Sequence, residues 1–229
     1  MKKILALALL LLIIGSGAFA LDIAVGGGAL FNYTWTMGTV KDVWTGSTGL
    51  FPGISVEQEI SRLGFGAFGF VGLGRFFELN LGFLYKNPGK MKMTAKYSGT
   101  VFFEDEADIS GFESVPALQF GVYFKYPFVI SDMMVVFPTA GIDYEMTLAD
   151  VKDGWWDDLW LRAGVGLDLF FSERAFVRIH AIYGFGIVMA DEKNSVYGKD
   201  FAQAVYEVKD WDSRYSHGLL LKAGIGYMF

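Results

Sequence analysis

The sequence predicts an all-β fold: an eight-stranded antiparallel up-and-down transmembrane β-barrel preceded by a cleaved signal peptide. Three observations carry this prediction. The 229 residues are 53% hydrophobic and 17% aromatic, which is too apolar for a disordered chain. Beyond the N-terminus, no apolar run reaches the roughly 18 residues that a membrane-spanning helix needs. The apolar residues instead recur with a period of two, which is typical of strands.

Residues 1–20 have the pattern of a secretory signal peptide. Two lysines precede an unbroken apolar stretch over residues 4–14, and Ala18-Phe19-Ala20 supplies an A-x-A cleavage site. A single membrane anchor is the alternative, but the apolar stretch is short and a glycine-rich turn interrupts it. Cleavage leaves residues 21–229 with 17 basic and 25 acidic side chains, a formal charge of −8. This acidity argues against a nucleic-acid partner, because phosphate contacts need Lys and Arg.

Cysteine is absent from the chain. This excludes a disulfide scaffold, a Cys-ligated zinc site and a lipoprotein anchor.

Six segments show the two-residue period, two glycine-rich segments are compatible with it, and all eight are long enough to cross a membrane at the usual tilt. The last segment is the clearest: from His217 to Phe229 the odd positions are mostly apolar, whereas the even positions are mostly small or polar. In the wall of a transmembrane barrel, the first set faces lipid and the second faces the lumen. The eight expected strands are 23–35, 63–73, 77–85, 115–126, 133–146, 159–170, 175–189 and 216–229.

The connections alternate between short and long. The short ones are 74–75, 127–132 and 171–174, and the long ones are 36–62, 87–114, 147–158 and 190–215. Outer-membrane barrels have short periplasmic turns and long extracellular loops, so we expect both mature termini in the periplasm. A soluble lipocalin-like barrel is the alternative, but it would place its apolar residues inside and its charges outside.

Polar side chains on the lumen face form a set with charges of both signs. An eight-stranded bore is just wide enough for side chains to fill, and unpaired buried charge is costly. We therefore expect a closed lumen with paired charges. An ion or solute path is the alternative, but this set has no excess of one charge sign that would select an ion. The set is Glu78, Asn80, Gln119, Lys125, Asp143, Glu145, Arg162, Asp168, Arg178, His180 and Lys222.

The six tryptophans fall at outward strand ends or in long loops. Trp35, with Trp156 or Trp160, suits an aromatic belt at the membrane surface. Trp44, Trp155, Trp156 and Trp211 are the candidates for loop packing or for interaction with an extracellular ligand. The expected periplasmic belt is Tyr126, Phe128, Phe171, Tyr227 and Phe229.

The connection 87–114 contains its own hairpin signal. Residues 91–97 alternate, Ser98-Gly99 offers a turn, and residues 100–104 are strand-like. The first arm carries Lys86, Lys90, Lys92 and Lys96, and the second carries Glu104, Asp105, Glu106 and Asp108. Cross-strand pairing of opposite charges is the simpler interpretation; a charge-patterned surface for a partner is the other.

The C-terminus carries a motif. Lys222, Gly224, Tyr227 and Phe229 resemble the polar-x-Gly-x-x-aromatic-x-aromatic β-signal with which outer-membrane barrels engage their assembly machinery. With the signal peptide and the eight strands, the chain resembles small outer-membrane barrels of the opacity-protein and OmpX/OmpW-type superfamily. The resemblance implies an integral outer-membrane location in a diderm bacterium, and a role in adhesion, surface interaction or small-solute uptake.

The expected function is therefore non-enzymatic: a barrel with a side-chain-filled lumen and surface loops for adhesion or surface interaction. A narrow OmpW-like channel for small apolar solutes is the alternative, and a lipid-modifying enzyme is a third. Catalysis is disfavoured because Ser216 and His217 are adjacent and point to opposite faces of a strand. No cofactor or metal site is expected, because the acidic loop residues lack EF-hand spacing. Expected partners are outer-membrane lipid, the assembly machinery and an extracellular ligand.

Overall fold

The computed structural model describes residues 22–41, 44–45, 49–50, 54–108, 114–148, 158–188 and 213–229. None of these residues belongs to a helix long and apolar enough to cross a membrane. The strands are β1 (Ile23–Lys41), β2 (Trp44–Thr45), β3 (Gly49–Leu50), β4 (Ile54–Leu73), β5 (Phe77–Lys86), β6 (Lys90–Tyr97), β7 (Thr100–Asp108), β8 (Val115–Lys125), β9 (Phe128–Ser131), β10 (Met134–Thr147), β11 (Asp158–Phe170), β12 (Ala175–Val188) and β13 (Ser213–Met228).

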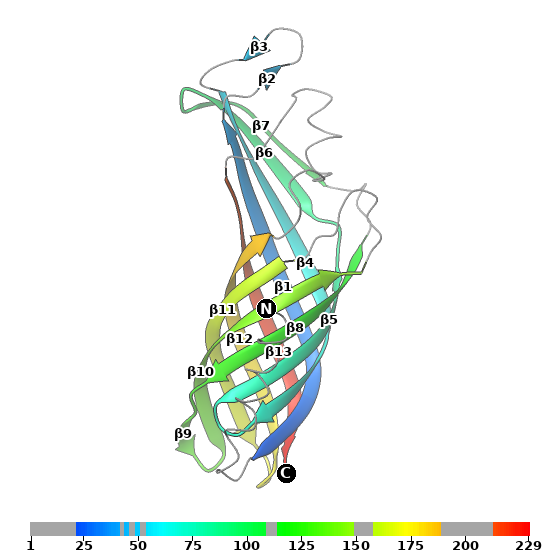
Figure 1. Cartoon of the computed structure of the whole chain (residues 1–229), viewed down its shortest axis with the longest axis vertical. Helices are drawn as coiled ribbons and strands as arrows, with labels where there is room; N and C mark the ends of the chain where they lie inside the picture. The colour runs from blue at the N-terminus through cyan, green and yellow to red at the C-terminus, as the bar shows by residue number, and fades with distance from the viewer. Residues whose placement is uncertain are drawn as a thin grey trace, which may run out of the picture.

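The strands close into a barrel (Figure 1), which confirms the prediction of an all-β antiparallel barrel. Within the described residues, the ring runs β1-β4-β5-β8-β10-β11-β12-β13, and the pairing of β1 with both β4 and β13 closes it. Every pairing in the ring is antiparallel. Apart from the inserted β6–β7 hairpin and the short strands outside the ring, neighbours in space are neighbours in sequence. The topology is therefore up-and-down.

The pairing register gives the tilt and the bore. A row of directly paired residues that starts at Gly26 on β1 returns to β1 at Thr36, ten residues further on. At a rise of about 3.3 Å per residue and a strand spacing of about 4.8 Å, this offset requires a tilt of about 40° and a radius of about 8 Å. Side chains can fill a bore of that size. The row is Gly26, Phe70, Asn80, Gly121, Asp143, Trp160, Gly186, Ser216 and Thr36.

The apolar side chains face outward and the polar ones inward. Along β5, exposed and buried residues alternate without a break: Leu81 is 53% exposed, whereas its neighbour Asn80 is 6% exposed. On β13, Leu221 and Ile225 are exposed while Lys222 is buried. A large exposed apolar wall around a polar interior is the distribution of a transmembrane barrel, and it is the reverse of the lipocalin-like alternative.

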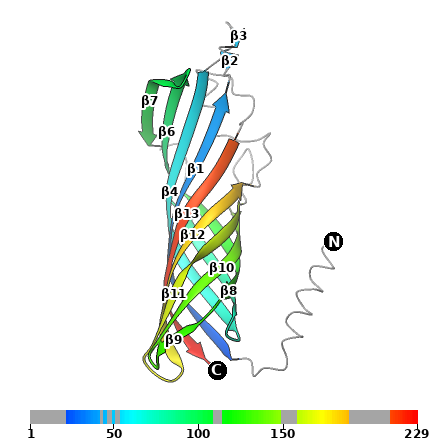
Figure 2. The same ribbon diagram turned by 90° about the vertical axis from the view of Figure 1, so that its left-hand side faces the viewer.

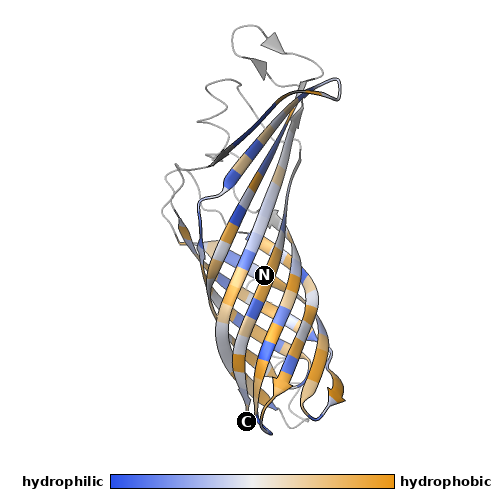
Figure 3. Cartoon of the chain, turned by 180° about the vertical axis from the view of Figure 1, so that it is seen from behind, coloured by the Kyte–Doolittle hydropathy of each residue, from blue (hydrophilic) through white to orange (hydrophobic). Residues whose placement is uncertain are grey.

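Two rows of outward side chains bracket the lipid-facing band. The lower row pairs Val25 with Tyr227, and the upper row pairs Trp35 with His217 and with Ser61. Ten residues of tilted strand between these rows span about 25 Å along the barrel axis, which matches the apolar band of outer-membrane barrels. Figure 3 shows hydrophobic segments over the barrel wall and hydrophilic segments among those of the strands that project beyond it.

A sheet projects from one end of the barrel, here called the loop end (Figure 2). It contains the upper parts of β1, β4 and β13, together with the β6–β7 hairpin, which continues the sheet along β4. Residues 36–41 and 54–62, expected as loop, are therefore strand. The predicted hairpin turn is present: Tyr97 pairs with Thr100, and Ser98 and Gly99 have φ of 47° and 83°, as a type I′ turn requires.

The opposite end, here called the turn end, holds the short connections and the C-terminus (Figure 1). The connection 127–132 was expected to be a turn, but most of it forms β9, which pairs with the first residues of β10. Single-sequence patterning missed this strand because Phe128–Ser131 is too short to show a period.

Candidate functional site

The lumen-facing set predicted from the sequence lies inside the barrel. Each of the 11 residues is buried, with at most 7% of its surface exposed. The charged members gather in two groups, one toward the turn end and one toward the loop end. The two groups occupy different depths of the bore because their residues lie at different distances from the strand ends.

The turn-end group centres on Arg178 of β12. Its Nε and Nη2 each donate to Asp168 on the neighbouring β11, at 2.6 Å, and its Nη1 donates to Glu78 on β5. Glu78 also accepts from Lys125 Nζ at 3.3 Å and from Asn80 Nδ2 at 3.0 Å. One guanidinium therefore joins carboxylates from opposite sides of the bore, and two cations share Glu78.

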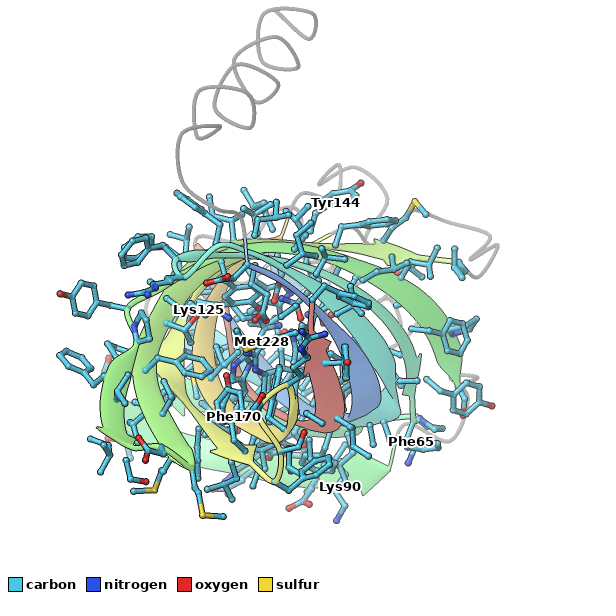
Figure 4. The ribbon with its side chains drawn as sticks, turned by 90° about the horizontal axis from the view of Figure 1, so that it is seen from below. Phe65, Lys90, Lys125, Tyr144, Phe170 and Met228 are labelled. Atoms are coloured by element: carbon cyan, nitrogen blue, oxygen red, sulfur yellow. The ribbon has the colours of Figure 1, made fainter. Side chains whose placement is uncertain are left out.

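Aromatic rings pack around the same guanidinium. Its Cζ lies 4.4 Å from the ring centre of Phe70, 4.9 Å from that of Phe176 and 5.3 Å from that of Phe137. Rings at this distance attract a cation and exclude water from its ion pairs. Seen from below, Lys125, Phe170 and Met228 lie within the ring of strands, whereas Phe65 lies outside it (Figure 4). This end of the bore is filled by ions and rings together.

The loop-end group centres on Asp143 of β10. Its Oδ2 lies 2.7 Å from Arg162 Nε, and it accepts from Gln119 Nε2 at 3.1 Å and from the Tyr123 hydroxyl. The Arg162 guanidinium in turn lies 4.7 Å from the ring centre of Trp160. Arg162 Nη1 and Nη2 have no hydrogen-bond partner within the described residues, so this group is less fully paired than the turn end, where Arg178 donates to two carboxylates.

Two further basic side chains and a histidine also lie inside the barrel. Lys86 pairs with Glu145. Lys222 donates to Asn80 Oδ1 at 3.3 Å and lies over the Tyr123 ring at 4.9 Å. His180 meets the Phe137 ring edge-on at 5.1 Å, and its ring nitrogens have no hydrogen-bond partner within the described residues.

Two sequence-based assignments are wrong. Trp160, a candidate for the surface belt, is 1% exposed and lies inside the bore, because it occupies an even position of β11 and even positions of that strand face inward. Lys86 was assigned to the hairpin but pairs with Glu145 inside the barrel, because it is the last residue of β5 rather than the first of β6.

The projecting hairpin carries paired charges on one face. Lys92 Nζ lies 2.5 Å from Glu104 and Lys90 Nζ lies 3.6 Å from Glu106, both across β6 and β7. The hydrogen bond from Lys92 to Glu104, and then the charge of Glu104, raise the pKa of Lys92. Lys96 pairs with Glu57 of β4 at 2.6 Å, and among the described side chains it has no ion pair with the second arm. The pattern is a ladder across three strands.

The β-signal residues divide between the two faces of the wall. Lys222 is inside, whereas Tyr227 and Phe229 are exposed outside, with ring centres 5.1 Å apart. Phe229 N also donates to Ile23 O at 2.9 Å, so the last residue helps to hold the seam between β13 and β1. Of the four loop tryptophans, Trp155, Trp156 and Trp211 lie outside the described residues, and only the backbone of Trp44, in β2, is described.

The histidine and serine weighed for catalysis point to opposite faces. Ser216 Oγ lies 2.8 Å from Thr36 Oγ1 on the inner face, whereas His217 Nδ1 lies 2.6 Å from the Tyr183 hydroxyl on the outer face. Trp35 stacks on His217 at 5.6 Å. Across the part of the chain that is described, no group of three or more metal-ligating side chains could hold a metal ion.

Comparison with known proteins gives no family. No family model matches the chain, and no curated protein matches it. Among solved structures it is similar to the outer-membrane protein OprG of Pseudomonas aeruginosa, with 12% identity, 92% of this chain and 96% of that chain covered, and a TM-score of 0.47. The outer-membrane protease OmpT of Escherichia coli gives 9% identity, coverage of 91% and 96%, and a TM-score of 0.34. The N-terminal barrel domain of Pseudomonas aeruginosa OprF gives 12% identity, coverage of 89% of this chain and 99% of that chain, and a TM-score of 0.33.

Similarities at such low sequence identity and TM-score support no statement about the function of this chain. The transmembrane assignment rests on the closed ring and its apolar outer wall.

Proposed function

We propose that this protein is a non-enzymatic integral outer-membrane barrel whose lumen is closed, and that it acts by presenting the projecting sheet to a partner outside the cell. The observation that carries the proposal is the filled interior. The Arg178 guanidinium meets Glu78 across the bore and Asp168 on the neighbouring strand, Arg162 lies beside Asp143, and aromatic rings pack around Arg178. Side chains that meet across a bore of this width support a closed lumen.

The outer-membrane location and the orientation are part of the proposal. The signal peptide pattern and the β-signal support export and barrel assembly. The short connections and the C-terminus share the turn end, and short turns lie on the periplasmic side of outer-membrane barrels. The projecting sheet then stands outside the cell.

The projecting sheet supports a role in surface interaction. It continues at least six residues beyond the upper row on β1, about 20 Å of strand. Its hairpin tip exposes Tyr97, Val101 and Phe103, which are between 47% and 56% exposed. Large apolar side chains held away from both membrane and core are typical of interaction surfaces, and the charge ladder beside them adds specificity.

Two measurements test the proposal. In planar bilayers, wild-type barrel should give no steady conductance, and a steady conductance would contradict a closed lumen. For the surface role, cells expressing the wild type should adhere to collagen-coated or albumin-coated surfaces more strongly than cells in which residues 90–108 are replaced by a two-residue Asn-Gly turn. Lys92→Glu should reduce adherence and Lys92→Arg should not. Equal adherence of all variants, at equal amounts of folded barrel, would contradict the role of the sheet.

A further inference from the structure

The buried side chains of the bore carry one more positive charge than negative charge. Lys86 adds a fifth cation to the four of the lumen set, because the structure places it inside the barrel. A buried charge is costly unless an ion of opposite sign compensates it, so the bore favours one additional anion. Within the described residues, the buried cations are Lys86, Lys125, Arg162, Arg178 and Lys222, and the buried carboxylates are Glu78, Asp143, Glu145 and Asp168.

Arg162 carries unused hydrogen-bond donors. Its Nη1 and Nη2, with four N–H groups between them, have no hydrogen-bond partner within the described residues. The side chain is 0% exposed, so bulk water does not reach these groups. By contrast, all three nitrogens of the Arg178 guanidinium donate to carboxylates. Because a buried donor without an acceptor costs free energy, the Arg162 guanidinium needs an acceptor that the described side chains do not supply.

Asp143 can use only part of the Arg162 guanidinium. A guanidinium has five N–H groups, and a carboxylate accepts from one edge of it, which presents two of them. Asp143 lies at the Nε edge, with its Oδ2 2.7 Å from Arg162 Nε. Even when the unpartnered Asp143 Oδ1 accepts from the neighbouring Nη on that edge, three N–H groups face away from it. The next carboxylate, Glu145, is already paired with Lys86.

Trp160 adds a donor beside the same guanidinium. Arg162 Cζ lies 4.7 Å from the ring centre of Trp160, and Trp160 Nε1 is also buried and unpartnered within the described residues. The benzene edge of the indole faces the inner wall at Gly186 and Gly218, where an added Cβ would lie 3.0 Å and 3.1 Å from Trp160 Cζ3. Because Nε1 is on the opposite edge of the indole, it points away from that wall. Two buried groups that can only donate therefore lie next to each other in the bore.

We propose that the Nη groups of Arg162 and Nε1 of Trp160 bind one small monovalent anion, such as chloride, inside the closed bore. The anion accepts from several N–H groups at once and supplies the missing negative charge. A water molecule would accept from the same donors but would leave the excess charge uncompensated, and a divalent anion would exceed it. The site does not involve the projecting sheet, so it is independent of the proposed surface role.

The direct test is a crystal structure of the purified barrel grown in bromide instead of chloride. Bromide gives an anomalous signal that water does not give. We expect one anomalous peak in hydrogen-bonding contact with Arg162 Nη1 or Nη2 and with Trp160 Nε1. A water at this position without anomalous signal, or a peak only at another cation such as Lys222, would overturn the proposal.

The second test measures stability in solution. The barrel is refolded into vesicles in potassium chloride or in potassium gluconate at equal ionic strength, and urea unfolding is followed by circular dichroism. Each tenfold increase in chloride above its dissociation constant should raise the folding equilibrium constant about tenfold. Arg162→Met should abolish this dependence, and Trp160→Phe, which keeps a ring but loses the N–H donor, should weaken it. Lys92→Met, on the exposed hairpin, is the control and should keep the wild-type dependence.

Heat-modifiable gel migration shows which variants are folded, and Trp160→Phe carries the comparison if Arg162→Met does not fold. A wild type whose stability is the same in chloride and in gluconate would overturn the proposal. An equal chloride dependence in wild type, Trp160→Phe and Arg162→Met would show a general salt effect and would also overturn it.

Discussion

Replacing Arg178 with methionine tests whether the lumen is a dry ion-paired core. The two side chains have similar length, so the substitution removes the charge and its donors while it keeps much of the packing against Phe70 and Phe176. Asp168, which is 6% exposed, then loses both of its 2.6 Å bonds from Arg178. Removing one partner of a buried ion pair costs about 3–5 kcal/mol, because the remaining charge is buried without compensation.

The measurement is the free energy of unfolding in a urea titration of the barrel in lipid vesicles, followed by tryptophan fluorescence. Arg178→Met should lose about 3–5 kcal/mol. Adding Asp168→Asn should recover part of that loss, because the orphaned charge is then removed. Lys92→Met, which breaks a pair on the exposed hairpin, is the control and should leave the unfolding midpoint unchanged. A loss below about 1 kcal/mol for Arg178→Met, the range of exposed pairs, would refute a dry interior and favour a water-filled one.

Three further predictions concern the wall. Leu221→Arg, on the lipid-facing side, should lower the free energy of unfolding by about 2–4 kcal/mol in vesicles, and an unchanged value would show that the face assignment is wrong. Deleting Phe229 should reduce the folded fraction in the outer membrane on heat-modifiability gels, because the β-signal loses its terminal ring and Ile23 loses a backbone bond; an unchanged folded fraction would contradict this. Gly28→Ala should lower the free energy of unfolding by about 1–3 kcal/mol in the same titration, because a Cβ there would clash with the backbone oxygen of Ala223. Wild-type stability of this variant would show that β1 and β13 can separate.

Local patterning predicted much of the barrel wall. A two-residue period is a property of neighbouring residues, so the inward and outward faces of β5 and β13 could be assigned before any strand was placed beside another. Arg178 and Asp168 are directly opposite on β12 and β11, and that pair could be expected once the two strands were known to be adjacent. The hairpin turn at Ser98-Gly99 was predictable because the turn type depends on a few adjacent residues.

Features that depend on distant residues needed the tertiary structure. The contact of Arg178 with Glu78 joins β12 to β5 across the bore, and it depends on the ten-residue offset of the closed ring. The same closure determined that Lys86 meets Glu145 inside the barrel. Trp160 was assigned to the surface from its place near a strand end, although its even position already indicated the lumen.

By itself, the sequence determined that this protein is a β-barrel with an apolar outside and a polar inside, because alternation along each strand separates the two faces before any long-range contact forms. The tertiary structure alone decided which interior basic side chains pair with which carboxylates, how far β1 and β4 continue beyond the membrane, and that Phe128–Ser131 forms a strand on β10. These depend on register and tilt, which arise when all the strands of the ring close together.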